Sequence, residues 1–453
     1  MKLRSLFLAV LAVLVLGATV RRVSADGPQN LLLFRNSSGV SQTITTNGTI
    51  DPNNAFFQNL GTNGRSCATC HQADQGWTVT PEKIRVRFVT TAGTDPIFRP
   101  VDGATCPTAD VSTVRARVSA YRLLLTKGLI RIDRPMPPNA EFTILSIDDP
   151  YNCSSVNDIS VYRRPSPATN LRFLSTVMWD GRETVPGQPV TADLITQALD
   201  ATTGHAQGQP PTQAQLNSIV QFETALFTAQ IRDNKAGRLD VDGAAGGPAN
   251  LSQQEFFVGI NDPLGLNPKG TPFDPEAFTI FKQWQQGFDE DKDQRLAKQS
   301  IQRGEQIFNN RIIHITGVAG LNDKLGIADI AGTCTTCHDS PNVGDHSVVA
   351  PLNVGVTDES RRTPDLPLFT IQCNTTGQII KTTDPGRAMV SGKCADIGKF
   401  KGPILRGLAS RAPYFHDGSA ATLLAAVNFY DTRFNLGLSN QDKADLVAFL
   451  QSL

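Results

Sequence analysis

The pattern Cys-x-x-Cys-His occurs twice in this chain, at residues 67–71 and 334–338. Two thiols at this spacing reach both vinyl groups of a haem, and the histidine that follows can turn beneath the iron as an axial ligand. A chain with 8 Cys and 6 His in 453 residues contains roughly 0.002 such patterns by chance. The sequence therefore predicts two covalently bound haem c groups. The predicted haem-binding residues are Cys67, Cys70, His71, Cys334, Cys337 and His338.

Zinc is the competing interpretation of these cysteines. A structural zinc ion takes four ligands, which the two Cys-x-x-Cys pairs could supply together. The histidine after each pair and the predicted export of the chain both favour haem.

The first 25 residues have the organisation of a secretory signal peptide. Lys2 and Arg4 precede an apolar run over residues 6–16, and Val23-Ser24-Ala25 fits a small-x-small cleavage site. An uncleaved N-terminal anchor is the alternative, although the run is shorter than the ~20 residues that a span needs. No other stretch is long and apolar enough to cross a bilayer. We therefore expect a periplasmic protein without a membrane span in its mature chain.

The charge balance excludes one class of partner. The formal net charge is zero, and loss of the signal peptide's basic residues would make it about −4. Nothing in this balance indicates a nucleic acid partner. A hydrophobic content of 40% with 19% charged residues is ordinary for a globular protein.

Four cysteines lie outside the two haem patterns: Cys106, Cys153, Cys373 and Cys394. In an oxidising compartment an even remainder suggests disulfides. Three pairings are possible. Proximity in the sequence favours Cys106–Cys153 and Cys373–Cys394, because each pair closes one excursion within one haem region.

The chain is long enough for more than one domain, and the two haem patterns divide it. Residues 26–250 are expected to form an N-terminal haem c domain with an insertion, and residues 251–453 a C-terminal haem c domain. Glycines over 233–250 indicate a linker between them. Two excursions, over about 80–165 and from the second pattern to about Lys399, predict loops and short strands. The expected fold is mostly α-helical, with two c-type cytochrome domains packed around a di-haem interface.

Two helices are expected to pair in the C-terminal half. The first runs over about residues 300–309 and contains Gly304 four positions before Phe308. A glycine lets a second helix approach closely while the aromatic ring packs beside the haem. The terminal helix, which begins with a capping box at Ser439 and Asp442, is the expected partner.

A further helix is predicted in the N-terminal half. Thr212, with Gln215 three residues later, is a typical capping pair. Apolar residues then recur at helical spacing as far as Leu226.

Three segments outside the haem patterns resemble bacterial di-haem cytochrome c peroxidases and their MauG relatives. They are Met-Trp-Asp-Gly-Arg at 178–182, Ala-Pro-Tyr-Phe-His-Asp-Gly at 412–418, and the terminal segment at 443–450. The resemblance covers most of the mature chain in order, but not the excursions with the spare cysteines. It implies an oxidoreductase that reacts with hydrogen peroxide.

By this resemblance, Trp179 lies between the two haems as an electron bridge. Its polarisable indole is suited to passing a hole between irons that are too far apart for direct contact. Met178 stands where the family commonly has phenylalanine. Packing in the core is the alternative role for a lone tryptophan.

The second haem's other axial ligand is a methionine in the peroxidases and a tyrosine in MauG-like enzymes. Counting fourteen residues from His416 leads to Tyr430, and none of the 4 methionines lies near it. The resemblance therefore implies that Tyr430 binds the second haem iron. A thioether raises the haem potential, whereas a phenolate lowers it and favours higher oxidation states. The alternative is a tyrosine that is merely packed on a helix.

Two family residues near the first haem are missing. No histidine lies between His71 and His205 to occupy the resting iron, so an iron open to peroxide is expected. The family's distal glutamate is replaced by a stretch that ends in His205. Peroxide cleavage needs a group that moves a proton between the two oxygens, and an imidazole is suited to this. His205 could instead ligate the first iron, or be a solvated loop residue.

Calcium between the domains is a further cofactor that the family implies. Pro165 stands where an asparagine ligand is expected, which argues against it. The acidic stretch from Asp289 to Ser300 also lacks the glycine and terminal glutamate of a calcium loop.

Taken together, the resemblance implies an exported di-haem oxidoreductase of the peroxidase/MauG type. Hydrogen peroxide would react at the N-terminal haem, and oxidising equivalents would be shared with the C-terminal haem through Trp179. The donor would be a redox protein, such as a cytochrome, or an oxidisable side chain of a partner protein. A passive electron-transfer cytochrome with both irons six-coordinate is the alternative, and it holds if His205 and Tyr430 both ligate iron.

Overall fold

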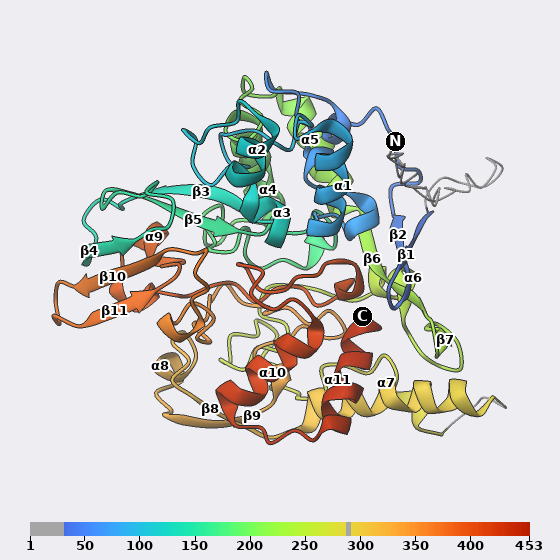
Figure 1. Ribbon diagram of the computed structural model, residues 1–453. Coiled ribbons are helices and arrows are strands. Elements are labelled where there is room, and N and C mark those ends of the chain that lie inside the picture. The colour runs from blue at the N-terminus through green and yellow to red at the C-terminus, as the bar shows by residue number, and fades with distance from the viewer. Residues whose placement is uncertain (1–30, 287–290) are drawn as a thin grey trace, which may run out of the picture.

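The computed structural model describes residues 31–286 and 291–453. The predicted signal peptide at 1–25 and Asp289 of the acidic stretch lie outside these residues. The chain is 32% helical and 17% strand, and its strands form several separate sheets (Figure 1). The prediction of a mostly α-helical fold is therefore wrong, and the protein is a mixed α/β fold. In the described ranges no helix has the length and apolar composition that a membrane crossing requires.

The elements follow the chain as labelled in Figure 1. The helices are α1 (Pro81–Thr91), α2 (Val114–Ala120), α3 (Arg122–Lys127), α4 (Val190–Thr203), α5 (Gln213–Thr224), α6 (Gly247–Ser252), α7 (Lys292–Asn310), α8 (Asn322–Leu325), α9 (Ala388–Ser391), α10 (Leu423–Phe434) and α11 (Asn440–Gln451). The strands are β1 (Leu31–Asn36), β2 (Gly39–Thr45), β3 (Ile130–Pro135), β4 (Phe142–Asp148), β5 (Asp158–Arg163), β6 (Leu226–Asp233), β7 (Gly237–Arg238), β8 (Ile313–Thr316), β9 (Asp329–Gly332), β10 (Leu368–Cys373) and β11 (Ile379–Thr382).

A four-stranded sheet, in the order β1-β2-β6-β7, is the first source of the unexpected strand content. The helix predicted from Thr212 does begin there, but it ends at Thr224, and the chain continues as strand β6. The first six residues of β6 are buried, and the strand pairs with β2 along its length. Tertiary pairing with a distant strand therefore overrides the helical spacing that continues to Leu226.

The two excursions meet in a second sheet, in the order β11-β10-β4. Strand β4 belongs to the first excursion, and β10 and β11 belong to the second. Figure 1 shows them side by side at one edge of the molecule. Their inward side chains form one apolar cluster that includes Phe142, Ile144, Phe369 and Ile371. The excursions are therefore one joint structure and not two independent loops.

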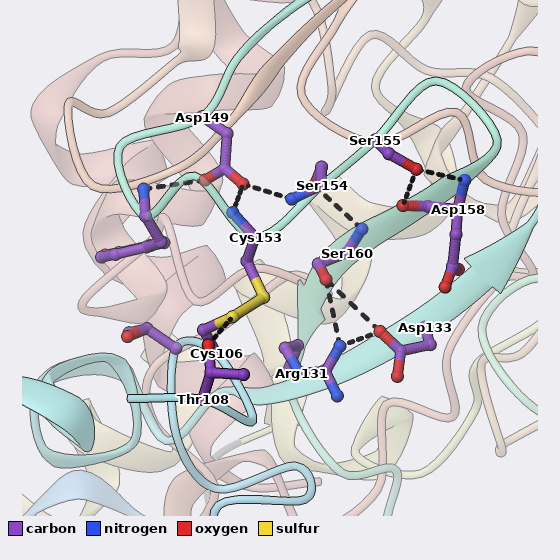
Figure 2. Close-up of a disulfide and its surroundings, with 12 residues drawn as sticks. Cys106, Thr108, Arg131, Asp133, Asp149, Cys153, Ser154, Ser155, Asp158 and Ser160 are labelled. Carbon is purple, nitrogen blue, oxygen red and sulfur yellow. Dashed lines mark hydrogen bonds and ion pairs between the residues drawn. A yellow bond between two sulfur atoms is a disulfide. The ribbon is translucent and has the colours of Figure 1, made fainter. Parts of the chain in front are cut away.

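Each excursion carries one of the favoured cysteine pairs. The structure joins Cys106 to Cys153, with Cα atoms 5.5 Å apart, and Cys373 to Cys394, with Cα atoms 5.8 Å apart. Figure 2 shows the first pair beside Asp149, whose carboxylate accepts a hydrogen bond from the Cys153 N–H at 2.8 Å. This is the pairing that proximity in the sequence favoured.

The segment expected to be a linker is folded. Residues 233–250 include β7 and the start of α6. Ala236 and Leu239 have no exposed surface and lie in the same apolar cluster as Phe449 of the terminal helix. Residues of the predicted N-terminal domain therefore pack against the terminal helix of the predicted C-terminal domain.

Helices α7 and α11 pack closely, as the sequence predicted, and lie side by side in Figure 1. The Ser439 hydroxyl caps α11 by accepting a hydrogen bond from the Asp442 N–H at 3.1 Å. A Cβ added to Gly304 of α7 would lie 2.1 Å from the Asp445 carbonyl oxygen and 2.6 Å from the Phe449 Cβ. The crossing therefore needs glycine at this position.

Gly304→Ala is expected to separate α7 from α11 and to lower stability by about 1–3 kcal/mol, as overpacking of a close contact does. The midpoint of thermal unfolding measures this. Leu296→Ala, which truncates an exposed residue of α7, is the control and should change the midpoint little. Equal midpoints for Gly304→Ala and Leu296→Ala would contradict the close packing of α7 against α11.

Candidate haem-binding sites

The two Cys-x-x-Cys-His patterns adopt the same local structure. Each begins with a short 3-10 turn, at Cys67–Thr69 and Cys334–Thr336. In each, the threonine before the second cysteine accepts a hydrogen bond at 3.0 Å from the N–H of the residue before the first cysteine. None of the four cysteines is in a disulfide, so their thiols remain available for thioether bonds.

The two histidines are oriented in the same way. The Nδ1 of His71 is 3.0 Å from the Trp77 carbonyl oxygen, and the Nδ1 of His338 is 2.8 Å from the Gly344 carbonyl oxygen. A carbonyl accepts only, so Nδ1 carries the proton and Nε2 is the free ligand atom. Burial lowers the pKa of both imidazoles, to about 4 for His338, which favours the neutral form that binds iron.

Each pattern lines its own cavity. The cavity of about 260 Å³ at the second pattern is largely apolar, with Phe308, Ile313, Leu352 and Val427 among its walls. The cavity of about 170 Å³ at the first pattern carries more polar side chains: Arg65, Asp102, His205 and Glu223. The two patterns therefore have separate sites of different polarity, and their cysteines are not pooled in one place as the zinc interpretation requires.

Three cations, of which Arg164 is buried and Lys401 and Arg411 are half-buried, lie at the walls of these cavities. Lys401 and Arg411 line both, and Arg164 lines the second. Arg164 and Arg411 donate to backbone carbonyls, and Lys401 lies 3.3 Å from the Thr176 carbonyl oxygen. Among the described residues none of these three cations forms an ion pair with a carboxylate.

Burial of these cations lowers their pKa values, to about 9 for Arg164, about 8 for Lys401 and about 10 for Arg411. A buried charge without a counter-charge is costly. The carboxylates of haem propionates would supply the missing negative charge. Together with the free thiols and the free Nε2 atoms, these cations fit two haem c groups.

Trp179 stands where both cavities meet, because it lines each of them. Its indole N–H donates to the Arg164 carbonyl oxygen at 2.8 Å. Its ring faces His416 edge-on, with centroids 6.3 Å apart. The structure thus brings the predicted bridge residue to the boundary between the two predicted haem sites.

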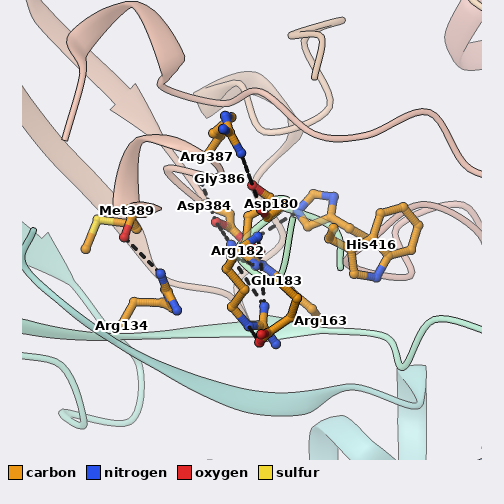
Figure 3. A network of polar contacts seen from close by, with 12 residues as sticks. Arg134, Arg163, Asp180, Arg182, Glu183, Asp384, Gly386, Arg387, Met389 and His416 are labelled. Atoms are coloured by element: carbon orange, nitrogen blue, oxygen red, sulfur yellow. Dashed lines mark hydrogen bonds and ion pairs between the residues drawn. The ribbon is translucent and has the colours of Figure 1, made fainter. Parts of the chain in front are cut away.

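A buried ionic network that the sequence did not reveal is centred on Arg163 and includes Asp180, the residue after Trp179 (Figure 3). Arg163 contacts Asp180 at 2.6 Å and holds both carboxylate oxygens of Asp384, at 2.7 and 2.9 Å. Burial alone would raise the pKa of Asp180, but the charges of Arg163 and Arg182 outweigh it and lower that pKa. Arg163 and Asp384 come from different excursions, so no local pattern signals their pairing.

Tyr430 of α10 lines the cavity of the second pattern, together with His338. Burial raises the pKa of its hydroxyl. Within the described chain this hydroxyl has no hydrogen-bond partner. The count from His416 thus leads to a tyrosine in the predicted haem cavity.

His205 lies in the turn after α4 and lines the cavity of the first pattern. Its Nδ1 is 2.5 Å from Asp102, which also contacts Arg65 at 2.6 Å. Its side chain is 37% exposed, so the imidazole reaches both the cavity wall and solvent. Asp102 lies in the first excursion, outside the family resemblance, and no local sequence pattern indicates its role.

Glu223 is another residue of the first cavity that the sequence did not indicate. It lines the first cavity from α5 and is 5% exposed, and its Oε2 has no hydrogen-bond partner in the described part of the chain. Burial raises its pKa to about 8. The one sequence feature that could have indicated Glu223 is its place near the end of a helix with many apolar residues. A carboxylate there is expected to be buried, and a carboxylate is rarely buried without a reason.

Pro165 lines both cavities, and it is the residue that argued against calcium. Across residues 31–286 and 291–453, no group of three or more His, Cys, Asp or Glu is arranged to hold a metal ion.

Comparison with known proteins finds similar sequences among cytochrome c peroxidases and MauG. The cytochrome-c peroxidase IdrP2 of Denitromonas iodatirespirans is 35% identical over 132 residues, which is 27% of this chain and 36% of the relative. The cytochrome c551 peroxidase of Nitrosomonas europaea is 34% identical over 121 residues, 26% of this chain and 30% of the relative. The methylamine utilization protein MauG of Methylophilus methylotrophus is 25% identical over 308 residues, 65% of this chain and 69% of the relative.

These alignments span only about a third of the two peroxidases, and no protein-family model matches the chain. Among solved structures, a MauG-like protein associated with microbial copper homeostasis aligns with a TM-score of 0.41 and 17% identity, over 88% of this chain and 85% of that one. By sequence, the chain is related to the cytochrome c peroxidases and MauG, which confirms the predicted family.

Glu223 predicts a pH dependence of stability. Its pKa is about 8 in the folded protein against 4.5 for an ordinary glutamate. Between these values the folded state binds the proton more tightly than the unfolded state, so stability falls as pH rises. Glu223→Gln removes this loss, on the order of a few kcal/mol.

Thermal unfolding of the wild type and of Glu223→Gln at pH 5 and pH 8 measures the effect. The variant should have the higher midpoint at pH 8 and a similar midpoint at pH 5. Glu82→Gln, at an exposed position of α1, is the control and should follow the wild type. If the midpoints of Glu223→Gln and the wild type differed by the same amount at both pH values, Glu223 would not be a buried, protonated carboxylic acid.

Proposed function

We propose that this chain is an exported, periplasmic oxidoreductase that binds two haem c groups and reacts with hydrogen peroxide at the first. It then passes oxidising equivalents to a redox protein or an oxidisable side chain of a partner. The observation that carries the proposal is that Trp179 lines both cavities, each of which contains one Cys-x-x-Cys-His pattern. The peroxidase and MauG relatives support the reaction class.

The two Cys-x-x-Cys-His patterns are proposed to belong to two haem c domains, residues 26–250 and 251–453, with side chains of each range lining both cavities. His71 and His338 would bind the two irons through Nε2, since their Nδ1 atoms are held by backbone carbonyls. A bound haem supplies the redox-active iron that accepts peroxide and stores oxidising equivalents. Lys401 and Arg411, which line both cavities, and Arg164, which lines the second, would hold the propionates.

Tyr430 is proposed as the second axial ligand of the second iron. Its hydroxyl lies in that cavity without a hydrogen-bond partner among the described residues, so it is free to bind. A tyrosine oxygen lowers the potential of a haem relative to a methionine sulfur. The second site would therefore stabilise oxidised states instead of serving as a high-potential entry for electrons.

His205 is proposed to move the proton at the first site. Its imidazole lines the cavity of His71, and Asp102 fixes its orientation. A positioned base that takes a proton from one peroxide oxygen and delivers it to the other speeds O–O cleavage by about 10²–10⁴-fold. The side chain therefore has the location and the type of group that the reaction needs.

The passive carrier remains the competing function, and one observation favours it. His205 and Tyr430 line different predicted haem cavities. If each bound the iron in its cavity, both irons would be six-coordinate. Coordination of the first iron by His205 would remove the peroxide site.

Trp179→Phe tests the bridge. In the wild type, peroxide added at the first site should alter the absorbance of both haems in rapid-mixing experiments. The variant should react with peroxide at a similar rate, while the change at the second haem becomes much slower, because phenylalanine is much harder to oxidise than tryptophan.

Trp284→Phe is the matched control. Trp284 is fully buried, whereas Trp179 is partly buried, and the Trp284 indole N–H likewise donates to a backbone carbonyl, that of Val241, but Trp284 lines neither cavity. Its variant should behave as the wild type. Equal rates at the second haem in Trp179→Phe and the wild type would rule out the bridge.

A further inference from the structure

Asp102 is a buried carboxylate in the first excursion, between α1 and α2, and it is only 4% exposed. Its Oδ1 accepts from the Arg65 guanidinium at 2.6 Å, and its Oδ2 lies 2.5 Å from the His205 Nδ1. Both neighbours line the cavity of the first haem pattern, as Asp102 does. A carboxylate supplied by the excursion thus enters the predicted peroxide site.

Arg65 fixes this arrangement from the other side. It lies two residues before Cys67 and is 3% exposed. Its guanidinium donates to the carbonyl oxygens of Pro96, Ile97 and His205, at 2.8, 2.8 and 3.1 Å, in addition to Asp102. The side chain of Asn63 holds the same His205 carbonyl at 2.8 Å. Backbone and side chain of the histidine are therefore both positioned relative to the haem pattern.

The charge state of Asp102 follows from these contacts. Burial alone would raise its pKa, but the hydrogen bond with His205 and the charge of Arg65 outweigh burial and lower the pKa. An ionised carboxylate only accepts hydrogen bonds. The proton on a neutral His205 must therefore lie on Nδ1, and Nε2 is left as a proton acceptor.

We propose that Asp102 is a positioning residue for peroxide activation, which sets the tautomer and orientation of His205 so that Nε2 accepts the proton of the incoming peroxide. This rests on the proposed function. With haem bound, Nε2 would take the proton from the peroxide oxygen nearer the iron and return it to the outer oxygen. That oxygen leaves as water when the O–O bond breaks, so the step takes up no net proton, and both oxidising equivalents stay with the protein.

The test uses the full haem-loaded protein and the variants Asp102→Asn, His205→Gln and their double variant. An asparagine amide can donate to Nδ1, which would move the proton to Nε2 and remove the acceptor. Asp102→Asn should therefore slow the second-order reaction with hydrogen peroxide about 100-fold, as His205→Gln should. Because Asp102 acts through His205, the double variant should lose no more than the single variants.

Cyanide provides a readout that does not depend on turnover. It enters as the weak acid HCN and gives up a proton when it binds ferric iron. Absorbance titrations should therefore show cyanide bound about tenfold or more weakly in Asp102→Asn and His205→Gln. Asp102→Glu keeps an acceptor and should restore both readouts to within about tenfold of the wild type.

Asp95→Asn is the matched control. Asp95 pairs with Arg87 in the same excursion, and Arg87 contacts the first haem pattern through the Thr69 carbonyl oxygen, but Asp95 makes no hydrogen bond or ion pair with His205 in the described chain. This variant should react as the wild type. A loss in Asp95→Asn equal to that in Asp102→Asn would show a general effect of disturbing the excursion and would overturn the proposal.

The other outcomes are equally decisive. Haem-loaded Asp102→Asn that reacts with peroxide at the wild-type rate would overturn the role of Asp102. So would a double variant whose loss of rate equals the product of the two single losses. In both cases the role of His205 would stand. Wild-type rates in His205→Gln overturn the proposed proton transfer itself. Should Asp102→Asn fail to load haem, Asp102→Glu decides: rates near those of the wild type support the proposal, and a loss as large as in His205→Gln contradicts it.

Discussion

The buried guanidinium of Arg163 joins the segments that meet between the two cavities. A charge that is removed from water must be paired, and Arg163 is paired twice, with Asp180 and with Asp384. Asp180 directly follows Trp179, so one of these contacts fixes the residue proposed to connect the haems. Loss of either carboxylate would leave the buried guanidinium with one ionic partner instead of two.

The other carboxylate extends this constraint to His416. Asp384 lies 3.8 Å from the His416 Nε2, and the His416 ring stacks on Phe400 with centroids 4.3 Å apart. The edge of Trp179 faces the same imidazole. The tryptophan, the histidine of the family segment and the second excursion therefore form one packed unit around Arg163.

The excursions are consequently part of the site, although the family resemblance does not include them. The first contributes Asp102 to the predicted peroxide cavity and the Arg163 guanidinium to the network. The second contributes Asp384. Their shared sheet, β11-β10-β4, and one disulfide in each hold these side chains in place. The relation between the haem regions therefore depends on segments that look like surface loops in the sequence.

The sequence correctly predicted those structural features that depend on short sequence patterns. The turns around Cys67 and Cys334, the capping of α11 at Ser439 and the close crossing at Gly304 each depend on a few neighbouring residues or on one small side chain. The mixed fold was missed because its strands pair across long separations, as β2 does with β6 and β4 with β10. The roles of Asp102, Glu223 and the Arg163–Asp384 pair were missed for the same reason. Each role depends on burial or on a partner that is distant in the sequence, and no local pattern indicates either.

The central claim is that two haem sites of unequal character share one bridge, and that the first keeps an iron position open for peroxide. The electron paramagnetic resonance spectrum of the purified ferric protein tests this most directly. The account predicts one high-spin haem, from the site of His71, together with one low-spin haem, from the site of His338 and Tyr430, in equal amounts. Two low-spin haems without a high-spin signal would contradict it and identify a passive electron carrier.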